Sequence, residues 1–249
     1  MSAAPLVLRS DADGVCTLTL NRPDKRNAVD IALFREFRGH VRDLETDTAT
    51  GLVVITGAGE HFCAGHDLTS KPHPDAFGWL RQELLTLERL TKLRQPVIAA
   101  VRGTCYTGGL EFALAADVII AGDSARFADT HGKWGLVPGW GLSQRLPRRV
   151  GQAKALEMMM TCRPYSGAEA AAMGLANACV PDADLDAHVA ALAATILANS
   201  WHSNAANKKL VYDTDGMPLA LGLTHELMRN EGFAPDTKER AGKFARPRT

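Results

Sequence analysis

Residues 103–111 read Gly-Thr-Cys-Tyr-Thr-Gly-Gly-Leu-Glu and connect an apolar run to a helical pattern. The run before them, at 96–101, is short and continuous, which is typical of a strand covered on both faces of a sheet. A strand, a glycine-rich turn and a helix in this order are a building unit of α/β proteins, whose open sheets bind ligands at such turns. The stretch therefore predicts an α/β fold and marks a candidate site.

Apolar runs and helical patterns also alternate on both sides of this stretch. Leu52 to Thr56 and Val118 to Ala121 resemble the run at 96–101. Between the first two runs, residues 77–93 carry one stripe of leucines at helical spacing (Leu80, Leu84, Leu87 and Leu90). Because parallel strands need a crossover connection, which is usually a helix, the alternation predicts parallel pairing.

The N-terminal part predicts a strand followed by an amphipathic helix. Cys16, Leu18 and Leu20 alternate with threonines until Pro23, which indicates a half-buried strand and a hairpin-like or edge start of the sheet. Residues 30–45 carry apolar side chains every three or four positions, with Asp30 as the N-cap and with Val29 and Phe34 placed as a hydrophobic staple.

After about residue 141 the strand signal disappears and helical patterns follow one another. We therefore predict a core over residues 1–195 and a helical C-terminal region over residues 196–249. The apolar stripes of these helices need a cover, either the chain's own sheet or another subunit. The predicted helices span 143–150, 152–161, 168–173, 184–198, 202–212 and 219–230.

Composition excludes several classes of protein. The 249 residues are 46% hydrophobic and carry 28 basic and 28 acidic side chains, so no net charge attracts nucleic acid. Each apolar run is far shorter than the roughly 20 residues of a membrane helix, and we expect a cytoplasmic protein without a membrane partner. The five cysteines are widely spaced and are expected to be reduced. His61, His66 and His73 are separated by glycine and prolines, and we predict no metal site.

The second glycine-rich turn brings a carboxylate next to free amides. The amides at Gly108 and Gly109 are unpaired donors at the start of a helix, and Glu111 lies on the same face one turn on. This arrangement suits proton transfer beside a carbonyl whose oxygen becomes negative. In the alternative interpretation Glu111 only caps its own helix. A nucleophilic Cys105 is disfavoured, because the turn lacks the glycine two residues after it.

The first glycine-rich loop, residues 57–68, begins like a dinucleotide-binding fingerprint. Phe62 occupies the position of the third glycine and no helical pattern starts there. A Rossmann site is therefore rejected.

Taken together, the motifs resemble those of the crotonase family, the enoyl-CoA hydratase/isomerase superfamily. The resemblance runs nearly end to end. It implies a spiral of ββα units with a helical trimerisation region, homotrimers or homohexamers, and an acyl-CoA thioester as substrate. No separate cofactor is implied, since coenzyme A is part of the substrate. The matching segments are 21–28, 62–68, 96–103, 108–111, 116–118 and 135–138.

The resemblance also implies roles for single residues. The backbone amides of His66 and Gly108 fall where the family forms its oxyanion hole. Similar Ala-Gly-His-Asp loops occur in family decarboxylases, and the alternative for the His66 side chain is a place at the pocket rim. The residues that correspond to coenzyme A contacts are Lys25, Arg26, Ala28, Ala64, His66, Asp67, Leu68, Gly108 and Gly109.

The family hydratases use two glutamates, and this chain matches only the first. Glu111 takes the first position, whereas His131 stands at the second, with Asp129 two residues before it. Imidazole can also transfer protons near neutral pH. We therefore expect an enoyl-CoA hydratase-like enzyme with Glu111 as the principal and His131 as the secondary acid/base. Another acyl-CoA reaction (isomerase, decarboxylase or hydrolase) and non-catalytic acyl-CoA binding are the alternatives.

Overall fold

The computed structural model describes residues 4–230 and 232–244. Its main sheet has six strands in the order β1-β2-β3-β4-β6-β9. The pairing of β1 with β2 is antiparallel and the other pairings are parallel, as predicted for the central runs. The strands are β1 (Val7–Ala12), β2 (Val15–Leu20), β3 (Leu52–Gly57), β4 (Val97–Val101), β6 (Val118–Gly122) and β9 (Ala178–Val180).

A small second sheet lies beside the first. It contains β5 (Thr104–Tyr106), β7 (Arg126–Ala128) and β8 (Tyr165–Ser166), in that order. Only two residues separate β4 from β5, so the chain passes from one sheet to the other and then enters α3 (Gly108–Leu114). This β-β-α unit is the repeat that the resemblance implies, and the predicted fold class is confirmed.

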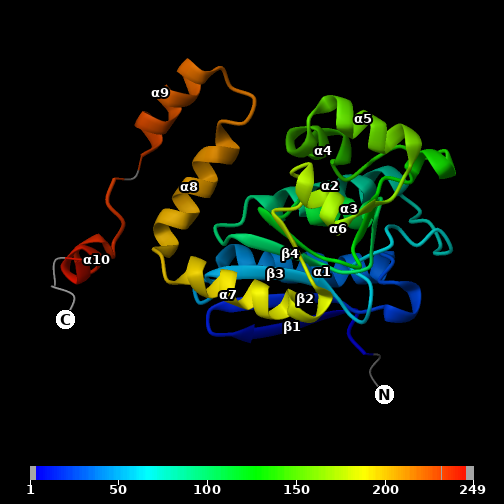
Figure 1. Cartoon of the computed structure of the whole chain (residues 1–249), viewed down its shortest axis with the longest axis horizontal. Coiled ribbons are helices and arrows are strands. Elements are labelled where there is room, and N and C mark those ends of the chain that lie inside the picture. Colours follow the sequence, from blue (N-terminus) through cyan, green and yellow to red (C-terminus); the bar gives the residue numbers. More distant parts are fainter. Residues whose placement is uncertain (1–3, 231, 245–249) are drawn as a thin grey trace.

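Helices cover both faces of the main sheet, which explains its continuous apolar strands. Ile98 and Ala100 face α7 (Leu185–Leu197), whereas Val97, Ala99 and Val101 face the larger core. The larger core also contains residues of α1 (Ile31–Thr46), α2 (Ala76–Thr91) and α3. Figure 1 shows α7 and α3 on opposite sides of the sheet. The apolar stripe of α7 is thus covered by the chain's own sheet.

The N-terminal predictions are confirmed. Asp13 and Gly14 join β1 and β2 with positive φ at both residues, the conformation of a tight hairpin turn. Asp30 caps α1, its carboxylate accepting a hydrogen bond from the Leu33 N–H at 2.8 Å. Val29 and Phe34, the predicted staple, are both fully buried.

The predicted leucine stripe of α2 is wrong at its first two positions. Leu80 and Leu84 are 39% and 37% exposed, and the buried face of the helix begins instead with Trp79 and Glu83. Leu80 lines a cavity that is open to solvent. Its apolar side chain therefore does not indicate which face of α2 packs against the core. Leu87 is buried as predicted.

The prediction that strands end after residue 141 is also wrong, because β8 and β9 follow. Strands of two and three residues are too short to show a pattern, and each is defined by its neighbour, β7 or β6. The remaining helical predictions are confirmed within a few residues. These helices are α4 (Leu142–Val150), α5 (Gln152–Thr161), α6 (Gly167–Ala172), α8 (Trp201–Asp213) and α9 (Leu219–Arg229); η1 (Pro23–Lys25), η2 (His131–Trp134), η3 (Asp182–Asp184) and α10 (Thr237–Phe244) complete the described elements.

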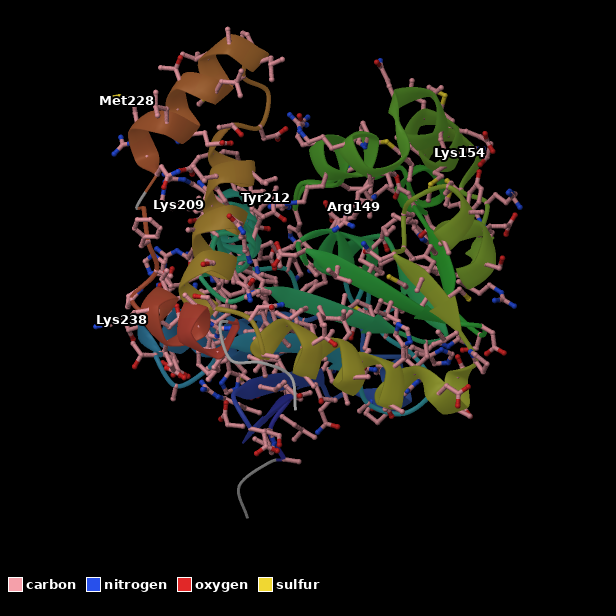
Figure 2. The ribbon with its side chains drawn as sticks, turned by 60° about the vertical axis from the view of Figure 1, so that its left-hand side comes forward. Arg149, Lys154, Lys209, Tyr212, Met228 and Lys238 are labelled. Atoms are coloured by element: carbon pink, nitrogen blue, oxygen red, sulfur yellow. The ribbon has the colours of Figure 1, made fainter. Side chains whose placement is uncertain are left out.

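Helices α8, α9 and α10 form an arm that stands to one side of the sheets (Figure 1). Asp117 fastens α8 to the sheet, because it accepts a hydrogen bond from the Tyr212 hydroxyl at 2.9 Å and pairs with Lys208 at 2.8 Å. Figure 2 shows Tyr212 turned toward Arg149 of α4, whereas Met228 lies farther out on α9. Within the described ranges, no helix is long and apolar enough to span a membrane. The predicted boundary at 195/196 falls in the last turn of α7 and stays a prediction.

Candidate active site

The two glycine-rich loops, α2 and the segment around η2 enclose a cavity of about 810 Å³. A cavity of this size suits a cofactor-sized or drug-sized ligand. Seven of the predicted site residues line it, namely Ala64, His66, Asp67, Leu68, Gly108, Glu111 and His131. Sequence positions as far apart as 64 and 131 thus meet in one place.

The other predicted contacts lie around this cavity without lining it. Lys25 and Arg26 are exposed, and the Arg26 carbonyl accepts a hydrogen bond from the Ala64 N–H at 3.0 Å, which ties this segment and Ala28 to the first loop. Gly109 has a packing role, because a Cβ there would lie 2.2 Å from the Cys63 carbonyl oxygen.

Close contact between the loops brings the His66 and Gly108 amides together. A Cβ on Gly65 would lie 2.2 Å from Thr107 Oγ1 and 3.3 Å from the Gly108 nitrogen, so only glycine fits. Val29 binds the residues on either side of His66, donating to the Gly65 carbonyl and accepting from the Asp67 N–H, both at 2.8 Å. The His66 N–H is therefore left out of the pairing.

The Gly108 amide is free because it opens a helix. Thr107 before it has φ +46°, a conformation that costs a β-branched residue free energy and that here turns the chain into α3. The Thr107 N–H donates to the Ala128 carbonyl at 2.9 Å, which holds this turn. Within the described part of the chain, neither the His66 N–H nor the Gly108 N–H has a protein acceptor.

Glu111 is buried, at 2% exposure, and aims into the cavity. Its Oε1 accepts hydrogen bonds from the Trp140 N–H at 2.8 Å and from the Leu142 N–H, the first of α4, at 3.0 Å. Burial raises the pKa of Glu111, against the opposing effect of these two donors. Glu111 therefore does not cap its own helix, and among the described residues none donates to Oε2.

His131 is held by the residue two positions before it. Strand β7 ends at Ala128, and Asp129 turns back to accept from the His131 ring Nδ1 at 2.6 Å and from its N–H at 3.0 Å. A carboxylate only accepts hydrogen bonds, so Nδ1 carries the proton and Nε2 remains for the cavity. Burial lowers the pKa of His131, but the hydrogen bond and charge of Asp129, with the charge of Glu111, outweigh it and the net shift is upward.

The side chains of the first loop have different environments. The His66 side chain lines the cavity with its ring 6.1 Å from the Trp140 ring, and desolvation of the ring lowers its pKa. The Asp67 carboxylate is engaged by Thr69 at 2.6 Å and by Arg22 at 3.0 Å, and these contacts lower its pKa to about 2 against the effect of burial. Asp67 therefore stabilises the loop.

Glu83 and Trp140, which contact each other in the wall of the cavity, were not identified by the sequence analysis. Glu83 of α2 is 3% exposed, and its Oε2 accepts a hydrogen bond from Trp140 Nε1 at 2.9 Å. Burial raises the pKa of Glu83 to about 7. Glu83 could have been found from its spacing, because Trp79, Glu83 and Leu87 are four residues apart and share one face of α2. Leu80 and Leu84 instead suggested that the neighbouring face is buried.

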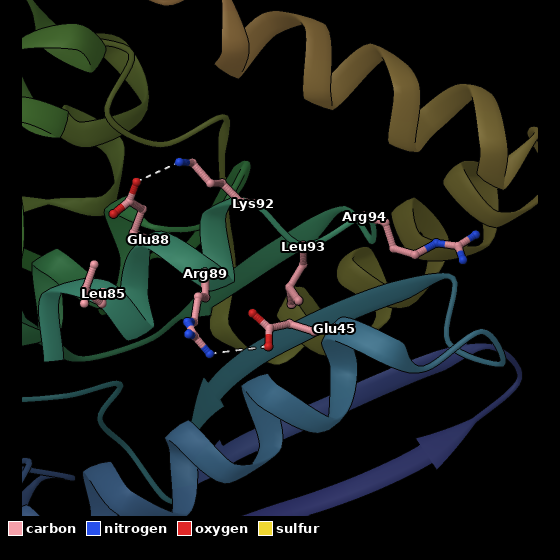
Figure 3. A pocket seen from close by; sticks show the side chains of 7 residues that line it. All are labelled: Glu45, Leu85, Glu88, Arg89, Lys92, Leu93 and Arg94. Atoms are coloured by element: carbon pink, nitrogen blue, oxygen red, sulfur yellow. Dashed lines mark hydrogen bonds and ion pairs between the residues drawn. The ribbon is translucent and has the colours of Figure 1, made fainter. Parts of the chain in front are cut away.

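Three other candidate sites are not supported by the structure. The hollow in Figure 3 lies between the ends of α1 and α2. Four of its charged side chains pair with one another, Arg89 with Glu45 at 3.5 Å and Lys92 with Glu88 at 2.7 Å, and Arg94 points away from them. Among the described residues, no group of three or more His, Cys, Asp or Glu side chains is arranged to hold a metal ion. Cys105 is fully buried, and burial raises its pKa, which disfavours a nucleophile.

Free amides beside a buried carboxylate are an arrangement suited to a carbonyl compound whose oxygen becomes negative. The Enoyl-CoA hydratase/isomerase family model matches residues 10–245. The chain belongs to this family, as the resemblance implied.

Individual relatives agree over most of their length. A protein of Arabidopsis thaliana named probable enoyl-CoA hydratase 1, peroxisomal, is 31% identical over 240 residues, which cover 95% of this chain and 90% of the relative. The crystal structure of an enoyl-CoA hydratase from Bacillus anthracis has a TM-score of 0.91 at 31% identity, covering 96% of this chain and 95% of that one. A Thermobifida fusca protein described as an enoyl-CoA hydratase, solved with acetoacetyl-CoA, has a TM-score of 0.85 at 30% identity, covering 91% and 93%.

Proposed function

We propose that the protein is an enoyl-CoA hydratase-like enzyme that adds water to an α,β-unsaturated acyl-CoA thioester, or removes it in the reverse direction. The observation that carries this proposal is the meeting of the free His66 and Gly108 amides with the buried Glu111 carboxylate in one cavity. The relatives named as enoyl-CoA hydratases support the reaction type.

The proposed mechanism assigns a partner to each charge that develops. Glu111, as a carboxylate, takes a proton from water while the water oxygen bonds to the β carbon of the thioester. Electrons move to the thioester oxygen, where the two amides stabilise the enolate by several kcal/mol. His131, as an imidazolium, then gives its proton to the α carbon, and exchange with solvent returns Glu111 and His131 to their starting forms.

The coenzyme A portion of the substrate is proposed to lie along the first loop. Lys25 and Arg26 supply exposed positive charge beside this loop, and Ala28, Ala64 and Leu68 supply small or apolar contacts. The proposed set also includes the backbones of His66, Asp67, Gly108 and Gly109. The acetoacetyl-CoA bound by the Thermobifida fusca neighbour supports a thioester ligand.

Assembly and location are further parts of the proposal. The arm exposes large apolar side chains, with Leu227 at 78% and Phe233 at 88% exposure, which supports burial against partner chains in a homotrimer or homohexamer. We also propose a division into a core (1–195) and a helical region (196–249), because the second region carries these exposed apolar side chains. A cytoplasmic location is proposed as well, although the Arabidopsis relative is named peroxisomal.

The deciding experiment is turnover of crotonyl-CoA beside a calorimetric titration with a saturated acyl-CoA. Loss of the conjugated enoyl absorbance, with a 3-hydroxyacyl product, supports hydration. A shifted double bond, released carbon dioxide or free coenzyme A would instead identify an isomerase, a decarboxylase or a hydrolase, and we would then withdraw the hydratase assignment. Binding without turnover on thioesters of graded length would identify a non-catalytic acyl-CoA-binding protein.

A further inference from the structure

One wall of the cavity carries a carboxyl group that the proposed mechanism does not use. Glu83 is almost fully buried and lines the same cavity as Glu111. A buried carboxyl group costs free energy unless it is hydrogen-bonded, and apolar side chains would cover this face of α2 more cheaply. Its Oε2 accepts from Trp140 Nε1 at 2.9 Å, whereas its Oε1 has no well-formed hydrogen bond among the described residues, although, against the larger effect of burial, the nearby Trp79 indole also lowers the Glu83 pKa.

Trp140 connects Glu83 to both parts of the proposed machinery. Its backbone N–H donates to Glu111 Oε1 at 2.8 Å. Its indole Cζ3 lies 2.5 Å from the position that a Cβ on Gly108 would take, so the ring packs directly on this backbone. The orientation of one tryptophan therefore affects both the acid/base group and one proposed oxyanion donor.

Packing and one hydrogen bond act together on this orientation. The Trp140 ring lies among Phe34 and Phe112, with ring centroids 5.5 Å and 5.8 Å away. Aromatic contacts of this kind favour particular tilts of the ring planes, whereas a hydrogen bond from Nε1 is satisfied only when that edge of the indole faces its acceptor. Glu83 is that acceptor.

We propose that Glu83 is a positioning residue for the reaction: by holding the Trp140 indole against Gly108, it keeps the Trp140 N–H aimed at Glu111. This inference rests on the proposed hydratase function and deepens it. The contact does not require a charged Glu83, because a neutral carboxyl oxygen also accepts from an indole N–H. The near-neutral pKa caused by burial agrees with a group that acts in either form.

The kinetic test compares Glu83→Leu with Glu83→Gln on crotonyl-CoA. Leucine removes the acceptor, and we expect kcat to fall about tenfold, the effect of losing a supporting contact, while KM changes less than about twofold. Glutamine keeps an amide oxygen for the indole and is expected to retain most of kcat. Thr86→Val is the matched control, since the Thr86 hydroxyl is buried on the same helix but donates only to the Gln82 carbonyl.

Equal losses of kcat in Glu83→Leu and Glu83→Gln would overturn the proposal, and so would an unchanged kcat in Glu83→Leu. If Glu83→Leu does not fold, Trp140→Phe replaces it. That variant removes the indole N–H and keeps an aromatic ring, so it is expected to show the same loss of kcat. A normal kcat in Trp140→Phe would equally overturn the proposal.

A second measurement does not depend on activity. In ¹H–¹⁵N NMR spectra the indole N–H signal of Trp140, assigned by its absence in Trp140→Phe, should move upfield in Glu83→Leu and stay in Glu83→Gln and Thr86→Val. An unmoved signal in Glu83→Leu would overturn the contact itself. If the wild-type protein fails to hydrate any enoyl-CoA, the proposed function fails, and this spectrum still decides whether Glu83 holds Trp140.

Discussion

The cavity and the C-terminal arm differ in where their polar side chains find hydrogen-bond and ion-pair partners. In the cavity, buried carboxyl groups are held by donors from distant parts of the same chain, as Glu111 is by Trp140 and Leu142. In the arm, several charged side chains pair within one helix, as Lys209 does with Asp213, while large apolar side chains face outward. The chain therefore supplies the donors that hold Glu111, whereas the arm presents a surface that we propose a partner completes.

The difference shows where a substitution should act. A change in the cavity disturbs a connected set of hydrogen bonds, so it should affect turnover more than assembly. A change on the outer face of the arm touches no described contact of the cavity, so it should affect assembly first. The following predictions test this division, from the largest expected effect to the smallest.

Glu111→Gln should reduce turnover of crotonyl-CoA by at least about 100-fold, because an amide cannot accept the proton that a general base removes. Affinity for coenzyme A thioesters should stay nearly unchanged, since the two proposed oxyanion amides remain. Steady-state kinetics and calorimetry measure the two effects. Glu88→Gln is the control, a partly exposed glutamate of α2 paired with Lys92. More than half of the wild-type rate in Glu111→Gln would remove Glu111 from the mechanism.

Leu227→Asp should weaken assembly and spare the cavity. Leu219, Leu223 and Leu227 lie on one exposed face of α9, and burial of one such leucine contributes about 2 kcal/mol. Sedimentation should show a trimer or hexamer for the wild-type protein and smaller species for the variant. Met160→Asp, an equally exposed site on α5, should leave the mass unchanged. A monomeric wild-type protein at micromolar concentration would contradict the proposed assembly.

The sequence predicted the parts of the molecule whose signals are local. The run 96–101 and the capped helix after Asp30 were found because each pattern is complete within a few residues. Glu83 and Trp140 were missed because their contact joins positions 57 residues apart, and the exposed Leu80 suggested the wrong face of α2. Asp129 accepts hydrogen bonds from His131 because β7 ends at Ala128. The end of so short a strand cannot be predicted from hydrophobic periodicity.

The alkaline side of the pH profile tests the residue that replaces the second glutamate. Glu111 must lose its proton, so the rate should rise with pH through its raised pKa. His131 must keep its proton, so the rate should fall as pH rises through a pKa above the usual value. His131→Gln should remove this alkaline limb and slow turnover, with Glu111 left to carry both transfers.

His131→Glu restores the carboxylate pair of the family hydratases and should retain or raise hydratase activity. Asp129→Asn is the companion variant, because it weakens the hydrogen bond that raises the pKa of His131 and should move the alkaline limb to lower pH. A normal rate and an unchanged pH profile in His131→Gln would withdraw the catalytic role of His131, while the fold and the proposed thioester substrate would stand.

Tyr212→Phe tests the contact between α8 of the arm and the central sheet, and we expect it to have the smallest effect of these variants. The Tyr212 hydroxyl donates to Asp117 Oδ1 at 2.9 Å, while Asp117 Oδ2 accepts from the Val97 N–H at the start of β4 at 2.7 Å. Asp117 thus links α8 to the central sheet. Tyr212 is partly exposed, so loss of its hydrogen bond to a charged acceptor should destabilise the protein by only about 1 kcal/mol.

Urea unfolding at one fixed protein concentration measures this loss, because assembly makes apparent stability depend on concentration. Val211→Ala, at the exposed neighbouring position, should change stability by less than about 0.5 kcal/mol. Turnover per folded protein should be normal in Tyr212→Phe, since the hydroxyl contacts nothing in the cavity. If turnover falls while stability is unchanged, the proposal that the site works independently of the arm is wrong. The contact between Tyr212 and Asp117 would then affect the geometry of the site.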